Sequence, residues 1–169
     1  MKRFPLSGFW ILAGVCLLGM MAYRGNGAAP EPLWVKVQLI WGTDEEKSPD
    51  SRHKAIEDDL SRKLSKSPFK WKHYFEVNRQ LVALPLGEAK NGVKVSSHCA
   101  IDLKSLGKDK IETKLYGKGK LLSTHKETVK KDWPLILAGN AENETAWLVV
   151  ITKIDAPQKQ TETPVTAPK

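Results

Sequence analysis

Cysteine is scarce in this 169-residue sequence, which contains only Cys16 and Cys99. Cys16 falls within an unbroken apolar run over residues 9–22, and the basic residues Lys2 and Arg3 precede that run. A basic start followed by a short apolar run is typical of an export signal. Removal of such a signal leaves Cys99 alone, so an internal disulfide is excluded and the exported part must be stabilised by its hydrophobic core.

The N-terminal apolar run is shorter than a membrane span. It contains 14 residues, whereas an α-helix that crosses a bilayer needs about 20. We therefore interpret residues 1–29 as a signal peptide that is removed, with an uncleaved N-terminal anchor as the alternative. Both interpretations predict a location in the periplasm, the cell envelope or the extracellular space. Membrane contact is expected only through this segment, if it is retained.

Arginine is rare beyond residue 29, where only Arg52, Arg62 and Arg79 occur. Three of the 27 basic residues and none of the 19 acidic residues lie in the signal, so the exported part has a net charge of +5. Forked hydrogen bonds to phosphate usually come from arginine. For an exported chain with few arginines we expect no nucleic-acid partner.

Lysine, by contrast, is concentrated in residues 104–131, where nine lysines stand against three acidic residues. Lysines on the outer faces of strands are commonly solvated and discourage edge-to-edge pairing, and this is the favoured interpretation. The alternative is that these lysines bind an anionic glycan or an anionic lipid surface.

Motifs for catalysis, phosphate binding and metal binding are missing from the sequence. The H-E-x-x-H zinc motif, the G-x-S-x-G serine motif and the phosphate-binding G-x-x-x-x-G-K-S/T motif do not occur, and residues 116–120 predict a hairpin turn. His98 and Cys99 are neighbours in a predicted strand and point to opposite faces, so we expect Cys99 to be a small buried residue beside Ile101 and Leu103. We therefore expect no enzyme activity, catalytic residue, metal or cofactor. An enzyme with a site assembled from distant residues is the least favoured alternative.

Two segments near the start of the exported part carry clear periodicity. Residues 33–42 alternate with a period of two, which predicts a strand. After a turn-rich stretch, Ile56, Leu60 and Leu64 recur at intervals of four. Only a helix places these three residues in one stripe, so the spacing predicts one amphipathic helix over residues 52–66.

Residues 69–77, FKWKHYFEV, alternate large rings with polar side chains. A period of two is typical of a strand with one buried face. We therefore expect the rings of this segment to be buried and the lysines, together with Tyr74, to face solvent. The predicted inner face carries Phe69, Trp71, His73, Phe75 and Val77, and the outer face carries Lys70, Lys72, Tyr74, Glu76 and Asn78.

Further short segments with strand patterns, separated by turn residues, follow up to residue 154. Together they predict a single α+β domain, mostly β, over residues 30–154, with about eight antiparallel strands in a sandwich or a strongly curled sheet and one amphipathic helix near the N-terminus of the mature domain. Residues 147–151 are apolar on both faces, which predicts an interior strand. Residues 155–169 lack an apolar pattern, so we expect a disordered tail.

The segments VQLIWGTDEE, FKWKHYFEVNRQ, LYGKGK and LILAGNAENETAWLVVI together resemble small exported bacterial proteins of unassigned function. The resemblance covers most of residues 33–152. It implies a compact, β-rich secreted domain, and it transfers no catalytic or binding residue to this chain.

These patterns favour a non-enzymatic module of the envelope or the extracellular space. We expect it to bind a partner protein or an anionic envelope polymer through a sheet face or a strand edge. The candidate binding residues are those expected on the outer faces and turns of the strands, namely Lys104, Lys114, Lys118, Lys120, Lys126, Tyr74 and Tyr116.

Overall fold

The computed structural model describes residues 30–66, 68–69, 71–140 and 145–157. The predicted signal peptide lies outside the described residues, as do residues 158–169 of the predicted tail. The described chain is mostly strand, as the sequence predicts, and it contains one helix. That helix is too short and too polar to cross a membrane, and the described residues hold no other candidate span.

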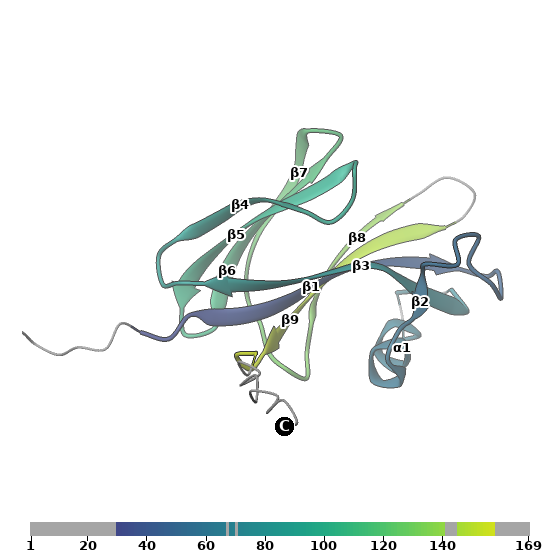
Figure 1. Ribbon diagram of the computed structural model, residues 1–169, viewed down its shortest axis with the longest axis horizontal. Helices are drawn as coiled ribbons and strands as arrows, with labels where there is room; N and C mark the ends of the chain where they lie inside the picture. The colour runs from purple at the N-terminus through teal and green to yellow at the C-terminus, as the bar shows by residue number, and fades with distance from the viewer. Residues whose placement is uncertain (1–29, 67, 70, 141–144, 158–169) are drawn as a thin grey trace, which may run out of the picture.

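The strands form two antiparallel sheets (Figure 1). Sheet A has five strands in the spatial order β2–β3–β1–β9–β8, and sheet B has four in the order β4–β5–β6–β7. The strands of sheet A are β1 (Leu33–Thr43), β2 (Lys54–Ala55), β3 (His73–Leu84), β8 (Leu135–Asn140) and β9 (Ala146–Ile154). Those of sheet B are β4 (Ala89–Lys94), β5 (Cys99–Gly107), β6 (Lys110–Gly117) and β7 (Lys120–Thr128).

The inner face of sheet A packs against sheet B in one hydrophobic cluster, which we call the inner cluster. Alternate residues of the central strands supply it, because successive side chains of a strand point to opposite faces. Each apolar side chain that is fully buried contributes about 1.5–3 kcal/mol, so this cluster stabilises the packing of the two sheets. Its buried members are Val35, Val37, Leu39, Val82, Leu84, Val95, Ile101, Leu103, Ile111, Leu115, Val129, Leu137, Val149 and Ile151.

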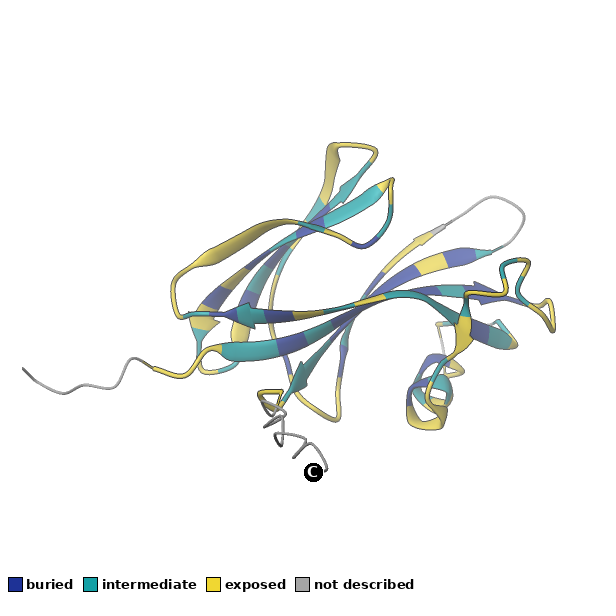
Figure 2. Ribbon diagram, in the orientation of Figure 1, coloured by how far each residue is buried: buried dark blue, intermediate teal, exposed yellow. Residues whose placement is uncertain are grey.

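The opposite face of sheet A is covered by α1 (Asp58–Leu64) and forms a second cluster, the outer cluster. Leu148 and Val150 of β9 point into the outer cluster, while Val149 and Ile151 point into the inner one. β9 lies between β1 and β8, so the prediction of an interior strand with two apolar faces is confirmed. Figure 2 shows the resulting concentration of buried residues along the central strands.

The helix is shorter than predicted and is not the first element of the domain. The prediction of a helix over residues 52–66 is wrong at its start, because residues 54–55 form β2 and pair with β3. Glu57 still has an extended backbone and precedes the first helical residue. Since β1 and β2 come before α1, the expected position near the N-terminus of the domain is also corrected. Leu60 and Leu64 are buried in the outer cluster, as their spacing predicts.

The predicted two-sided pattern of residues 69–77 is wrong in part. β3 starts after Phe69 and Trp71, and both of these rings pack against the outer cluster. Tyr74 points into the same cluster with only 4% of its surface exposed, so its expected outward orientation is wrong. Phe75, the next residue of the strand, faces the other side of sheet A.

The lysines of this segment bear on the same prediction. Lys72 is exposed, as expected, and its backbone N–H donates to Asp44 Oδ1 at 3.1 Å. Lys70 lies outside the described residues.

A bulge in β3 explains how its later half returns to a regular pattern. Leu39 of β1 pairs with Asn78 and Ile40 pairs with Glu76, so Val77 is an extra residue. An extra residue shifts the faces of the strand that follow it. Glu76 and Arg79 therefore lie on the same side of sheet A, where Arg79 donates hydrogen bonds of 2.9–3.1 Å to the Glu76 carboxylate.

Candidate functional site

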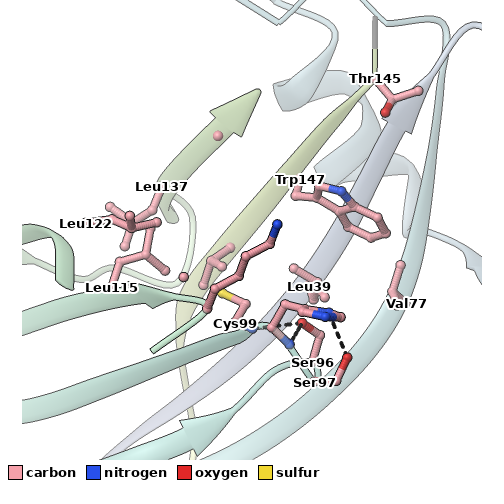
Figure 3. Close-up of a pocket in the computed structure, with 15 residues that line it drawn as sticks. Leu39, Val77, Ser96, Ser97, Cys99, Leu115, Leu122, Leu137, Thr145 and Trp147 are labelled. Carbon is pink, nitrogen blue, oxygen red and sulfur yellow. Dashed lines mark hydrogen bonds between the residues drawn. The ribbon is translucent and has the colours of Figure 1, made fainter. Parts of the chain in front are cut away.

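A cleft of about 760 Å³ lies between the two sheets, at the end that carries the β6–β7 turn. Figure 3 shows side chains of both sheets directed into the same space. The walls are mainly apolar, with Leu39, Leu137 and Trp147 from sheet A and Leu115 and Leu122 from sheet B. The cleft is therefore built by residues that are far apart in the sequence and that only the packing of the two sheets brings together.

The floor of the cleft is continuous with the core. Leu39, Leu115, Leu137 and Val149 belong to the inner cluster and also line the cleft. Trp147 lies on the same face of β9 as Val149 but retains 40% of its surface exposed. The cleft is thus the part of the apolar interior where the two sheets leave space between them.

Three aromatic rings form a row beside this floor. Trp41 of β1 pairs directly with Phe75 of β3 and with Trp147 of β9. The distance between ring centroids is 6.0 Å for Trp41 and Phe75 and 6.4 Å for Trp41 and Trp147, with interplanar angles of 33° and 30°. His53 approaches the edge of Trp41, at a centroid distance of 6.3 Å. Sequence analysis missed this row because only the strand register shows which rings are neighbours.

Leu122 reaches the cleft through a bulge in β7. Leu115 pairs with Ser123 and Tyr116 pairs with Leu121, so Leu122 is an extra residue. Bulges redirect side chains in this way. A Cβ atom at Gly117 would lie 2.7 Å from Leu122 Cδ1. Glycine at position 117 therefore leaves the room that Leu122 occupies at the cleft.

Two turns form the polar rim of the cleft. In the turn between β4 and β5, the backbone N–H groups of Val95 and Ser96 donate to the Cys99 carbonyl at 3.0 and 3.1 Å. The β6–β7 turn confirms the predicted hairpin at residues 116–120, since Lys118 and Gly119 both have positive φ, as a two-residue turn requires. The Lys118 N–H donates to the His98 carbonyl at 2.7 Å, which ties the two turns together.

Cys99 is half-buried at the base of this rim. It packs against the inner cluster that contains Ile101 and Leu103, as its place in the strand predicts, although it is less buried than expected. Burial raises the pKa of the Cys99 thiol. A thiol with a raised pKa stays protonated near neutral pH and is a poor nucleophile. In the described chain no hydrogen bond joins Cys99 Sγ to a histidine ring.

The lysine-rich strands form a different surface, the outer face of sheet B. Ile111, Thr113 and Leu115 of β6 point inward and are buried, so Lys114 and Tyr116 point outward. The register places Lys104 opposite Glu112, and Glu112 opposite Lys126. The structure thus brings four of the sequence-predicted binding residues to one face, namely Lys104, Lys114, Lys126 and Tyr116.

Acidic side chains on this face offset part of its positive charge. Lys126 Nζ lies 3.1 Å from Glu112 Oε2, and this hydrogen bond lowers the pKa of Glu112. Tyr116 donates its hydroxyl to Asp102 Oδ2 at 2.9 Å, which raises the pKa of Tyr116. The outer face of sheet B therefore carries side chains of both charges, with an excess of lysine.

The remaining predicted binding residues lie elsewhere. Lys118 and Lys120 are exposed at the β6–β7 turn, and Lys118 also lines the cleft. Tyr74 is on sheet A, where it points into the outer cluster. These residues therefore do not form one site with the outer face of sheet B.

The comparisons with known proteins add no assignment, because no protein family, no curated protein and no solved structure matches this chain. Among the residues that the structure describes, no three His, Cys, Asp or Glu side chains gather as a possible metal site.

Proposed function

We propose that this chain is an exported, non-enzymatic binding module whose two sheets form a sandwich that is open at one end. The cleft at the open end holds the ligand. The N-terminal sequence supports export, and the cluster shared by both sheets supports the sandwich.

The observation that carries this proposal is the size and character of the cleft. Its volume of about 760 Å³ lies within the roughly 300–1,000 Å³ of typical small-molecule sites, which are mostly apolar with a few polar groups. Trp147 supplies a broad, partly exposed ring, and Leu122 adds an exposed apolar side chain on the opposite wall. Exposed apolar surface raises the free energy of the protein in water. A ligand that covers this surface lowers that free energy.

The charge of the rim selects the class of ligand. The ionisable side chains that line the cleft are Lys118, His98 and the protonated Cys99, and no carboxylate is among its described lining residues. An apolar group that carries a negative charge is complementary to such a site. An acyl chain with an anionic head and an apolar peptide segment with a carboxylate share this chemistry.

The state of Cys99 argues against a catalytic use of the same cleft. Nucleophilic catalysis by cysteine needs a lowered thiol pKa and a base in contact with the sulfur. Here burial raises the pKa of the thiol, and the His98 ring nitrogen Nδ1 is 2.9 Å from Ser97 Oγ. Cys99 therefore serves as an apolar wall of the cleft.

Binding of 1-anilinonaphthalene-8-sulfonate, an apolar ring system with one sulfonate, tests the proposal. A Cβ atom at Gly139 meets no atom within 4 Å and its φ is not in the positive region, so Gly139→Trp fills the cleft without backbone strain. We expect strong fluorescence enhancement with the unmodified chain and with the control Gly139→Ala, and at least about tenfold weaker binding for Gly139→Trp, a loss of about 1.4 kcal/mol. Absence of enhancement, or equal binding by all three proteins, contradicts the proposal.

A second candidate function is binding of an anionic glycan or lipid surface by the outer face of sheet B. It is supported by the convergence of Lys104, Lys114 and Lys126 on that face. The paired substitution Lys104→Gln with Lys114→Gln then weakens retention on an anionic glycan matrix, whereas Lys63→Gln with Lys66→Gln, near α1, leaves it unchanged. Retention above roughly 0.5 M salt, where charges are screened within a few Å, indicates specific recognition. Equal elution of both double variants rejects this candidate.

A further inference from the structure

The two sheets end in strands that differ in how they resist pairing with another chain. An edge strand exposes unpaired backbone N–H and C=O groups, and soluble proteins usually protect such edges by charges, bulges or short length. β4 carries two lysines and an irregular register, and β7 carries two lysines, a glutamate and a bulge. β2 has only two residues.

β8 is the exception among the described edge strands. Its sequence, LILAGN, contains no charged residue, and its recorded pairing with β9 has no register shift. β8 pairs on one side with β9 and closes the order of sheet A, so its other side is a regular edge. Ala138 and Gly139 are exposed along it.

The surface next to β8 is also apolar. Trp133, two residues before the strand, has 74% of its surface exposed, and Trp147, which pairs with Gly139, has 40% exposed. Space above Gly139 is open, since a Cβ atom there would meet nothing within 4 Å. An uncharged edge with a large apolar ring at its start and open space near its end is the pattern of a surface that another strand covers.

We propose that two copies of this chain pair through their β8 strands. A two-fold axis perpendicular to sheet A places the two identical edges side by side in antiparallel orientation, and it joins the two sheets into one continuous sheet. The start of each β8 then lies beside the end of the other, so the exposed Trp133 of each copy approaches the open end of its partner's strand. Two such edges can pair without electrostatic repulsion, because β8 contains no charged residue although the chain as a whole is positively charged.

The same geometry limits the assembly to two copies. A contact made by the same edge on both chains closes on itself, so it forms a dimer rather than a fibre. The charged β4 and β7 edges of sheet B stay free of such pairing. Gly139 and Trp147 also line the cleft, but the pairing itself is made by the main-chain edge of β8, so the dimer does not require the ligand proposed for the cleft.

The mass of the full chain in solution, measured by light scattering after size-exclusion chromatography, tests the dimer. Loading concentrations from about 1 µM to about 500 µM cover the range expected for a small interface. We expect the mass to rise toward twice the 18.9 kDa of one chain. Ala138→Lys places two ammonium groups side by side in the centre of the pair and returns the mass to that of a monomer, because like charges on paired strands repel.

Ala89→Lys is the matched control, because Ala89 is also an exposed alanine on an edge strand, β4. It must leave the dimer intact. Loss of the dimer in Ala138→Lys, with the N-terminal run unchanged, excludes association through that apolar run. Thermal unfolding of both variants shows that they fold. As a second measurement, hydrogen exchange of the β8 amides slows with concentration in the unmodified chain but not in Ala138→Lys. A chain that is monomeric up to about 500 µM, or a dimer that survives Ala138→Lys, overturns the proposal.

Discussion

Tyr74 donates its hydroxyl hydrogen bond to the main-chain carbonyl of Leu64, 3.0 Å away. Leu64 is the last residue of α1, and the last carbonyls of a helix have no partner within the helix. The bond therefore satisfies a helix end and fixes α1 against β3. Since Tyr74 is buried beside Ile40, one side chain contributes both to the outer cluster and to helix placement.

Removal of this hydroxyl should cost stability. We expect Tyr74→Phe to lower the free energy of unfolding by about 1–2 kcal/mol, because it leaves a buried carbonyl unpaired. The matched change Tyr116→Phe removes a hydrogen bond on the outer face of sheet B, where water replaces it, and should cost less. Urea unfolding of both variants measures the difference. Equal losses would show that the Leu64 carbonyl gains nothing from Tyr74.

Substitution by alanine should have different costs at two glycines of sheet A. A Cβ atom at Gly42 would lie 3.2 Å from ring atoms of both Trp71 and Tyr74, and two packed rings cannot both give way. We expect Gly42→Ala to lower the free energy of unfolding by about 1–3 kcal/mol, the usual cost of overpacking. Gly139→Ala enters open space and should change it by less than about 0.5 kcal/mol. Thermal unfolding of the pair checks this; a tolerated Gly42→Ala would contradict the packing described here.

Glu76 makes the stability of the fold depend on pH. Burial opposes its ionisation, but hydrogen bonds from Arg79 and Gln38 outweigh burial and lower the pKa of Glu76. A lowered folded-state pKa stabilises the fold above the unfolded value of about 4.3, and this contribution disappears as pH falls through the folded-state pKa. Glu76→Gln should therefore flatten the decline in unfolding free energy below about pH 5. Urea titrations at several pH values test this, and an unchanged slope would exclude Glu76 as its source.

The thiol of Cys99 should react slowly in the folded chain. Because burial raises its pKa, its rate with a disulfide reagent should keep rising at pH values where the unfolded chain has reached its maximum. Cys16→Ser removes the only other thiol, so the signal reports Cys99 alone. A folded-state rate that levels off at lower pH than the unfolded one would indicate an activated thiol and would favour the enzyme alternative.

Local periodicity predicted those parts of the fold in which a strand runs regularly. The alternation in β1 and the two apolar faces of β9 follow from side-chain direction alone. The failure at residues 69–77 has a local cause, since the chain passes Phe69 and Trp71 across the outer cluster before β3 begins. A period of two shows that side chains alternate, but it does not show where the strand starts.

The cleft was beyond the reach of the sequence for a different reason. Its walls come from seven strands and from the segments that connect them, and a bulge in β7 directs Leu122 into it. The lysines of sheet B were easier to predict, because a period of two within a single pair of strands already places Lys104 and Lys114 on outward positions. Which acidic residues oppose them depends on the register, which the sequence does not show.

The location of a bound apolar anion tests the central proposal most directly. Nuclear magnetic resonance spectra of the ¹⁵N-labelled chain, titrated with 1-anilinonaphthalene-8-sulfonate, report which backbone amides respond. We predict that the shifts are concentrated at Cys99, Leu122 and Trp147. Shifts confined to Lys104, Lys114 and Lys126 would contradict the cleft as the binding site and would favour the outer face of sheet B.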